Sequence, residues 1–486
     1  MIAVASSVDR HTSRCGRSVL AACSKPRMQS ARSSAIVAAL TLALAGCAGP
    51  KVKTADVAPV QPAAAWRTDA GATAPIDAQW WTRFGDPTLI ALIDKALANN
   101  SDIAIAAGRV REARANVQLA RSQLFPTLDF IGAGGRSRSV SAFGTPLQQT
   151  FEQPQVQAAY EVDLFGRLAD TTSAARSAYL ASAAARDAIR LAVASATAGQ
   201  YITLLGLDAR LSIARQTVTA RADALRLANS RDQAGYSPKL ELRQAEAAYD
   251  DAAQIVAQIE TAIVRVEDSL SQLVGDVPGA IARTATLDGV TRPPIPEGLP
   301  SQLLERRPDI AQAANQLAAT DASLSAARKR FLPQLRLSGA AGRAYSSALA
   351  DPITLWSIGG SVLAPLFEGG RLAAQAEAAA SQRDQAAAIY QRTVLTSFRE
   401  VEDALASVKQ VDAQLVLARH EVDVLVDTLR LATNRYREGY SSYLEQLDAQ
   451  RGLLGAQLST AGLETEALTA RVQLYQAMGG GWAASP

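Results

Sequence analysis

The stretch that decides the fold is residues 372–438, which read LAAQAEAAASQRDQAAAIYQRTVLTSFREVEDALASVKQVDAQLVLARHEVDVLVDTLRLATNRYRE. It contains neither proline nor glycine. Apolar side chains recur in it at alternating steps of three and four, from Val401 through Leu415 to Tyr436. A repeat of 3.5 residues keeps one apolar seam against a partner helix. The stretch therefore predicts one helix of roughly 100 Å that packs as a coiled coil and ends at Gly439.

The same design occurs twice along the chain. Residues 227–241 match residues 431–445 at a constant offset of 204, and both copies contain Arg-x-x-x-Gly-Tyr-Ser. The earlier copy carries its own apolar seam, in which Arg221 is the one polar interruption. Upstream, residues 102–136 match residues 309–343 at an offset of 207. The chain is therefore an internal duplication with one long helix in each half.

Two pairs of short segments show the alternation that is typical of strands. They are residues 127–137 and 155–164 in the first half, and 334–344 and 356–366 in the second. Strands of about ten residues cross a bilayer when they are tilted. Soluble hairpins that cap the helices are the alternative, and alternation alone does not exclude them. Because open sheet edges are not tolerated in lipid, membrane-crossing strands would require several chains to share one barrel.

The remaining segments give the plan of the whole chain. Each half is expected to contain a helix, two strands, a long helix, a glycine tip and a returning helix. The break at Asn99 separates two helices, with Ser101 or Asp102 as the second N-cap. We expect no segment after the leader to be apolar enough for a transmembrane helix. The predicted segments are a leader (1–46), a lipidated extended segment (47–85), the first repeat (86–276), a proline-rich linker (277–300), the second repeat (301–478) and a C-terminal tail (479–486).

The N-terminus has the features of a secretory leader. Arg27 and Arg32 precede the apolar run 35–44, and Leu-Ala-Gly follows directly before Cys47. A positive flank, an apolar core and a small-residue cleavage site make a signal peptide. A cysteine at that position predicts covalent lipid attachment to its thiol and to the freed amine; a chance cysteine after an ordinary signal peptide is the alternative. Met28 is an alternative start of the chain.

Composition after removal of the leader excludes several classes of function. The leader holds six of the 49 basic and one of the 46 acidic residues, which leaves 43 and 45 and a net charge of −2. Nucleic-acid binding therefore loses its support. Cys47 and His420 are the only cysteine and histidine left, which argues against intrachain disulfides, a metal site and histidine catalysis. We expect no enzyme, and no cofactor apart from the lipid on Cys47.

Several motifs resemble those of the TolC-type outer-membrane efflux factors, and within them those of the NodT/OprM lipoprotein branch. The resemblance covers essentially the whole chain after the leader. Its most specific parts are Arg-Arg-Pro-Asp and Gly-Gly-Gly-Trp. The motifs are Trp-Trp-x-x-Phe-x-Asp-Pro-Thr-Leu at 80–89, Leu-Glu-Arg-Arg-Pro-Asp-Ile at 304–310, Phe-Pro at 125–126, Leu-Pro at 332–333, and Leu-Tyr-Gln-Ala-Met-Gly-Gly-Gly-Trp at 474–482.

The resemblance implies a mainly α fold with a membrane β-barrel. Three chains would share a twelve-stranded barrel, four strands from each, continued by a twelve-helix α-barrel in the periplasm. The implied function is a passive outer-membrane duct that carries drugs or other small molecules. Its partners would be a periplasmic adaptor and an inner-membrane RND-type pump. A duct for type I protein secretion or metal-cation efflux is the alternative, and a periplasmic coiled-coil scaffold lipoprotein is a further one.

The resemblance also assigns roles to residues at the two helix tips. The adaptor would dock on Gly235, Tyr236 and Ser237 of the first tip and on Gly439, Tyr440 and Ser441 of the second.

A gate is implied beside these tips. Tyr436 and Glu241 match a tyrosine–acid pair of the closed state, and Leu444 and Asp448 match two lumen-facing rings. Glu445, Asp448 and Arg451 fall at i, i+3 and i+6, near one helical face. The alternative for them is a plain surface pair between Asp448 and Arg451.

Overall fold

The computed structural model describes residues 53–55, 60–68, 75–235 and 239–482. The fold below is that of the unit Val52–Pro486. The leader and Cys47, together with Tyr236 and Ser237 of the first tip, lie outside the described residues.

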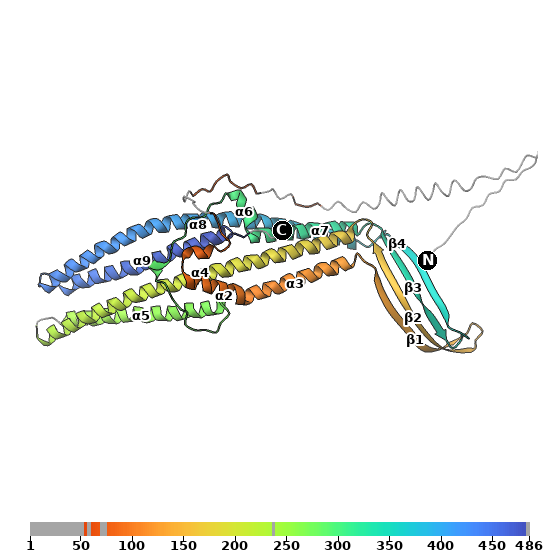
Figure 1. The fold of residues 1–486 in the computed structure, drawn as a ribbon, viewed down its shortest axis with the longest axis horizontal. Coiled ribbons are helices and arrows are strands. Elements are labelled where there is room, and N and C mark those ends of the chain that lie inside the picture. The colour runs from red at the N-terminus through yellow and green to blue at the C-terminus, as the bar shows by residue number, and fades with distance from the viewer. Residues whose placement is uncertain (1–52, 56–59, 69–74, 236–238, 483–486) are drawn as a thin grey trace, which may run out of the picture. The chain divides into compact units, whose positions relative to one another are not determined.

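Both halves repeat the order short helix, 22-residue helix, two strands, long helix and returning helix (Figure 1). α3 and α7 have 22 residues each, α4 and α8 have 67, and α5 and α9 have 35. These equal lengths confirm the predicted duplication and the two long helices. The first half contains η1 (Trp80–Phe84), α2 (Pro87–Asn99), α3 (Ser101–Ser122), β1 (Thr127–Val140), β2 (Pro146–Val162), α4 (Arg167–Gln233) and α5 (Lys239–Leu273), followed by η2 (Leu287–Gly289). The second contains α6 (Pro300–Arg306), α7 (Pro308–Lys329), β3 (Gln334–Ser346), β4 (Ile353–Leu363), α8 (Arg371–Arg437) and α9 (Tyr443–Ala477).

The long helices pack through the predicted seams. In α8, Val401, Val408 and Leu415 are buried, whereas Val422 and Leu429 nearer the tip are only partly covered. α4 packs along both its own returning helix α5 and α9 of the other half. α8 packs along α9 but has no comparable contact with α5 among the described residues. One flank of α8 is therefore left open in the single chain.

Two equivalent hydrogen bonds connect the C-terminal ends of the returning helices α5 and α9 to the residues that precede α3 and α7. Asn100 donates to the carbonyl of Leu273 at 3.0 Å, and Arg307 donates to that of Ala477 at 2.9 Å. These are matching positions of the two halves. Asn100 also accepts from the backbone N–H groups of Asp102 and Ile103. The N-cap of α3 is therefore Asn100 rather than the predicted Ser101 or Asp102, because its side chain lies one residue ahead of the first helical turn.

The strands form one antiparallel sheet in the order β1-β2-β3-β4. β2 pairs with β3 across the duplication, so the two hairpins are not separate caps. The predicted ends of two strands were wrong. β2 is Pro146–Val162 rather than 155–164, and β4 is Ile353–Leu363 rather than 356–366. The stretch 146–154 is mostly polar and lacks the alternating apolar pattern of a strand. Its backbone nevertheless pairs fully with β1.

The continuous register gives the sheet two different faces. Phe130 lies opposite Val156, and Ala341 lies between Val156 and Trp356. Because side chains alternate, every second residue from these positions shares their face. The face that contains them, which we name the apolar face, includes Leu128, Phe130, Val156, Ala158, Leu335, Leu337, Trp356, Ile358 and Val362. The opposite one, the polar face, includes Gln149, Gln153, Gln155, Gln157, Ser338, Ser357 and Ser361.

By length and composition, one described helix is apolar enough to cross a membrane. It is α4, with a mean hydropathy of 1.2 over its best window. The expectation that no segment would qualify was therefore wrong. Half of that window is buried inside the protein, as expected for a core helix: Ala194, Tyr201, Ile202 and Leu204 pack beneath the aromatic cluster that contains Trp80. The Ala- and Leu-rich composition of α4 thus has a packing explanation.

Candidate functional site

The candidate site lies where the long helices end. Gly235 follows α4 with φ 74°, and Gly439 follows α8 with φ 80°. Neither position is crowded, so the left-handed backbone is what favours glycine at both. At the second tip, the backbone N–H of Tyr440 returns to the carbonyl of Arg435 at 2.8 Å. The Tyr440 side chain is 79% exposed and is available for contact with another protein.

Tyr436 connects the two tips. Its hydroxyl donates to the carboxylate of Glu241 on α5. The guanidinium of Arg231, from α4, lies 4.8 Å from the centre of its ring, a cation–π arrangement. The ring of Tyr443, from α9, lies at a centroid distance of 5.7 Å. All four long helices therefore meet at the side chain of Tyr436, and the resemblance correctly placed it beside Glu241.

The charges around Tyr436 keep its hydroxyl protonated. Burial is the main cause that raises the pKa of Tyr436, and the hydrogen bond to Glu241 raises it further, while Arg231 opposes both. Arg231 also lies 3.8 Å from Glu241. A hydrogen bond with one charged partner contributes about 1.5–3 kcal/mol. At neutral pH the phenol therefore remains a donor, and the tie between the tips persists.

No functional role was assigned from the sequence to a buried arginine that lies below the tips. Arg221 is 1% exposed and donates to the carbonyl of Ala248 and to Asp251. Its Nε and Nη2, and the hydroxyl of Tyr443, have no hydrogen-bond partner in the described part of the chain. Burial raises the pKa of Tyr443, and the charge of Arg221 opposes that shift. The sequence feature that could have pointed to Arg221 is that it is the one polar residue in the apolar seam of α4.

The other predicted gate residues lie on the exposed side of α9. Leu444, Glu445, Asp448 and Arg451 are all exposed in the single chain. Glu445 forms an ion pair with Arg435 of α8 at 3.2 Å. Asp448 and Arg451 form none with each other among the described residues. The alternative, a surface ion pair between Asp448 and Arg451, is therefore wrong. The acid that forms an ion pair is Glu445, and its partner Arg435 lies on the neighbouring helix α8.

Two cavities accompany this region. One of about 650 Å³ lies between the tips, and Glu241, Tyr436, Ser441, Tyr443 and Leu444 contribute to its lining. It therefore separates the ends of the two hairpins, and the hydrogen bond of Tyr436 bridges them.

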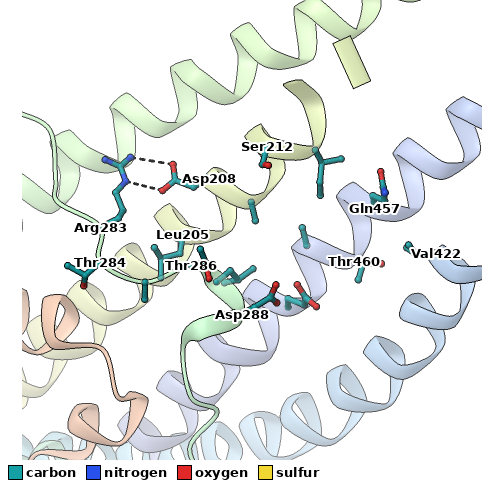
Figure 2. Close-up of a pocket in the computed structure, with 16 residues that line it drawn as sticks. Leu205, Asp208, Ser212, Arg283, Thr284, Thr286, Asp288, Val422, Gln457 and Thr460 are labelled. Carbon is teal, nitrogen blue, oxygen red and sulfur yellow. Dashed lines mark hydrogen bonds and ion pairs between the residues drawn. The ribbon is translucent and has the colours of Figure 1, made fainter. Parts of the chain in front are cut away.

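The other cavity, of about 690 Å³, lies further along the helices, between α4, α9 and residues 283–288 of the linker (Figure 2). In Figure 2, Arg283 reaches from the linker to Asp208 on α4, with Nε 2.9 Å from the carboxylate. Arg283 also pairs with Glu267 at 2.5 Å. Its charge is thus used to hold the linker against both helices of the first hairpin.

Neither cavity has the arrangement of a catalytic or metal centre. The charged groups that the structure pairs in them form ion pairs between helices, as Arg231 and Glu241 do, or between a helix and the linker, as Asp208 and Arg283 do. Within the described ranges, no group of three or more His, Cys, Asp and Glu side chains is placed to hold a metal ion. The chemistry available at the tips is reversible hydrogen bonding and ion pairing, which suits contacts that open and close.

Comparisons with known proteins agree with this geometry. The sequence profile of the family described as "Outer membrane efflux protein" matches residues 92–276 and 299–480. The chain is 33% identical over 423 residues to the toluene efflux pump outer membrane protein TtgC of Pseudomonas putida, covering 85% of this chain and 87% of the relative. It is 32% identical over 459 residues to the pyoverdine export outer membrane protein OpmQ of Pseudomonas putida, covering 92% and 97%. A crystal structure of a membrane protein from Pseudomonas aeruginosa superimposes with a TM-score of 0.81 at 30% identity, over 89% of this chain and 98% of that one.

Proposed function

The chain belongs to the outer membrane efflux protein family, and on this premise we propose that three copies of it form a closed duct across the outer membrane and into the periplasm. Membership makes it an outer-membrane channel component of an efflux system. The proposal concerns its assembly, its gate, its lipid anchor and its partners.

The observation that carries the proposal is that one chain is an open segment of a ring. β2 of the first half pairs with β3 of the second, whereas β4, the equivalent of β2, has no strand beyond it in the described chain. α4 packs on α9 of the other half, whereas α8, the equivalent of α4, packs on α7 and α9 of its own half and has no comparable contact with α5 among the described residues. Adding another copy would supply β1 to β4 and α5 to α8. Repetition of that step closes both rings at once.

The exposed side chains support this assembly. The apolar face of the sheet has no cover within the described chain, as expected for a barrel wall that faces lipid. On α8, Leu417, Val424 and Leu431 are exposed at steps of seven residues. A stripe with that period is the pattern of a helix that packs against a partner helix. A periplasmic scaffold would explain the stripe but not the sheet.

We assign the tips to docking and closure. The exposed Tyr440 and the turn at Gly439 would receive a periplasmic adaptor, which in turn would connect the duct to an inner-membrane RND-type pump. The hydrogen bond of Tyr436 to Glu241 would hold the resting tips together. Three copies of Leu444 and Asp448 around one axis would narrow the lumen and make it negative there.

The transported substrate is not encoded in a pocket of this chain. Two relatives are named for toluene efflux and pyoverdine export, compounds with little chemistry in common. A wide aqueous duct needs no binding site of its own, so the pump would select the substrate. Ducts of type I protein secretion or metal-cation efflux remain the alternative for the partner system.

The lipid anchor is proposed for Cys47. The Leu-Ala-Gly that precedes it is the observation behind this proposal. Three acyl chains on one residue exceed the two signals needed for stable anchoring. Mass spectrometry of the mature N-terminus tests it: a free, unmodified Cys47, or cleavage elsewhere, contradicts the anchor.

Drug resistance in cells tests the function as a whole. A strain that lacks its own outer-membrane duct should regain resistance when this chain is expressed with its adaptor and pump. Gly439→Glu should abolish that gain without loss of the assembled protein, because charge and bulk would stand in the docking turn. Gly455→Glu, at an uncrowded position further along α9, is the matched control. Full resistance with Gly439→Glu would remove the docking assignment.

A further inference from the structure

Three arginines share the apolar face of the sheet but lie beyond its apolar residues. Arg136 and Arg138 follow Phe130 in β1 by six and eight residues, and Arg343 follows Ala341 in β3 by two. Every step is even, and the pairing register of β1 with β2 has no interruption. The three side chains therefore point to the same side as Phe130 and Trp356 rather than toward the polar face.

The charge of these arginines is not neutralised by the chain. All three are exposed, and in the described residues none forms an ion pair with a carboxylate. Arg136 is held by a neutral group. With the side-chain amide of Gln148 on β2 turned so that its oxygen faces the guanidinium, this oxygen accepts from Nε of Arg136 at 2.8 Å. By contrast Arg336, on the polar face, faces Glu161 at 3.8 Å.

One acid lies among them on the same face. Glu152 of β2 is opposite Gly134 and Tyr345, between the levels of Arg136 and Arg343, and it is exposed without an ion pair in the described part of the chain. Asp351, in the turn between β3 and β4, lines the same surface cavity as Glu152. The patch therefore carries three positive charges, with two negative charges in or beside it. With three copies in a closed barrel, each copy would present one such patch on the outer wall.

The depth of the patch follows from the register. This face is apolar from Val156 to Val162 of β2. That stretch is roughly 20 Å along the strand, close to the height of the apolar band of a membrane barrel. Arg343 follows Gly342, which pairs with Gln155, so it lies just past this band. Arg136 pairs with Thr150, roughly 20 Å past Val156.

The side of the membrane follows from the chain connections. The patch lies toward the turns that join β1 to β2 and β3 to β4, whereas the helices join the opposite strand ends. If the helices are periplasmic, as the proposed function requires, the patch faces the outer leaflet and the layer above it.

We propose that Arg136, Arg138 and Arg343 bind the phosphate groups of a phosphorylated glycolipid in the outer leaflet. This inference rests on the outer-membrane location in the proposed function. The planar guanidinium matches phosphate with two parallel hydrogen bonds. The aliphatic stem of Arg343, just past the apolar band, can lie along the apolar wall while its charge reaches the headgroup. The site begins at Arg343 and extends outward to Arg136 and Arg138, on the outside of the wall rather than the lumen. It is therefore suited to the large phosphorylated headgroup of a lipid rather than to a dissolved anion.

Lipid binding by the purified assembly tests the proposal. The parent and the variant Arg136→Gln/Arg138→Gln/Arg343→Gln are each titrated in detergent with lipopolysaccharide that carries its lipid and inner-sugar phosphates. Bound lipid is counted by native mass spectrometry. Each basic residue near an anionic surface strengthens binding. We therefore expect the affinity for the phosphorylated lipid to fall about fivefold for each arginine removed. The same lipid after enzymatic dephosphorylation should bind the parent and the variant equally weakly.

Arg336→Gln is the matched control, because it removes one charge from the same sheet on the opposite face. It should bind the phosphorylated lipid as the parent does. If the triple variant does not assemble, the pair Arg343→Gln and Arg343→Lys replaces it, and the lysine variant, which keeps the charge but loses the paired hydrogen bonds, should lose less affinity than the glutamine variant.

Equal binding of the phosphorylated lipid by the parent and the triple variant overturns the proposal, and so does binding by the parent that dephosphorylation does not weaken. Phosphatidylglycerol that binds as tightly as the glycolipid would also overturn it, since the site would then be unselective. Because transport is not measured, failure here is distinguishable from loss of resistance in the Gly439→Glu experiment.

Discussion

Tyr436 is the residue at which closure of the duct is most directly testable. Replacing it with phenylalanine removes the hydroxyl that donates to Glu241 and leaves the ring packed on Tyr443. Asp448→Ala removes the proposed ring of charge in the same neck. We expect the double variant Tyr436→Phe/Asp448→Ala to conduct more than the parent in planar bilayers, since the tips lose about 1.5–3 kcal/mol of attraction per pair.

A second tyrosine at the same tip serves as the control for that experiment. Tyr440 is exposed and close in sequence, and no hydrogen bond of its hydroxyl is seen among the described residues. Tyr440→Phe should therefore leave conductance at the parent's level. A double variant that conducts no better than the parent would show that the gate is elsewhere.

The raised pKa of Tyr436 predicts a pH dependence. Its pKa in the folded protein lies above the unfolded value of about 10. The stability that it contributes is therefore fully present below pH 10 and is lost as the pH rises through the folded pKa. The melting temperature should fall less steeply above about pH 10 in Tyr436→Phe than in the parent. Parallel curves for the two proteins would contradict this assignment.

At the scale of residues, sequence reasoning reached only part of the site. The contact between Tyr436 and Glu241 was accessible through the resemblance, because both residues sit at fixed distances from the tip glycines. The stacking of Arg231 on Tyr436 was not, since it depends on how two hairpins meet. The Asp448–Arg451 pair was wrong because helical spacing alone ignores the neighbouring helix, where Arg435 captures Glu445.

At the scale of elements, helices were predictable and strand ends were not. The seam and the glycine cap are local signals, and they place α8 to within about one residue of the structure. β2 is longer than the sequence pattern suggests, because Leu147 and Phe151 are the only large apolar side chains of its outer half. Backbone pairing with β1 determines that segment, and hydrophobic periodicity carries no information about it.

Close contact between α4 and α9 gives a prediction for these elements. A Cβ on Gly206 would collide with Oγ1 of Thr465, a hydroxyl that itself donates to the carbonyl of Ala461 at 2.8 Å. Gly206→Ala should therefore lower stability by about 1–3 kcal/mol through overpacking. Adding Thr465→Ala should restore most of the loss, as the melting temperature of the assembled protein would show.

The same helix offers a control for that substitution. Gly199 lies in α4, and a Cβ there would meet nothing within 4 Å. Gly199→Ala should leave stability unchanged or raise it by about 0.5–1 kcal/mol, the usual helical gain of alanine over glycine. Equal effects at Gly199 and Gly206 would mean that packing on α9 does not decide the requirement for glycine.

At the scale of the whole molecule, the proposed assembly makes the chain one part of a larger ring. Its two halves are equivalent, yet their surroundings differ: the first half has the second beside it, and the second has no further described segment on its far side. Duplication thus explains why both the sheet and the helices end in unpaired edges on the same flank. The sequence alone indicated that several chains must combine, but which flanks join follows from the contacts of α4 and β2.

The last prediction tests this joining of flanks. Cysteines at Ala133 of β1 and Ser357 of β4 lie on the two edge strands, and both positions belong to the polar face. If β1 of one copy pairs with β4 of the next, a short bismaleimide should link neighbouring chains and give products of two and three times the 51.1 kDa chain mass, reduced by the leader. Cysteines at Gln157 and Ala340, which are opposite each other within one chain, should give internal links and no such ladder. A ladder from the second pair, or monomers alone from the first, would contradict closure through these edges, because the open edges of β1 and β4 would then be satisfied by something other than another copy of the chain.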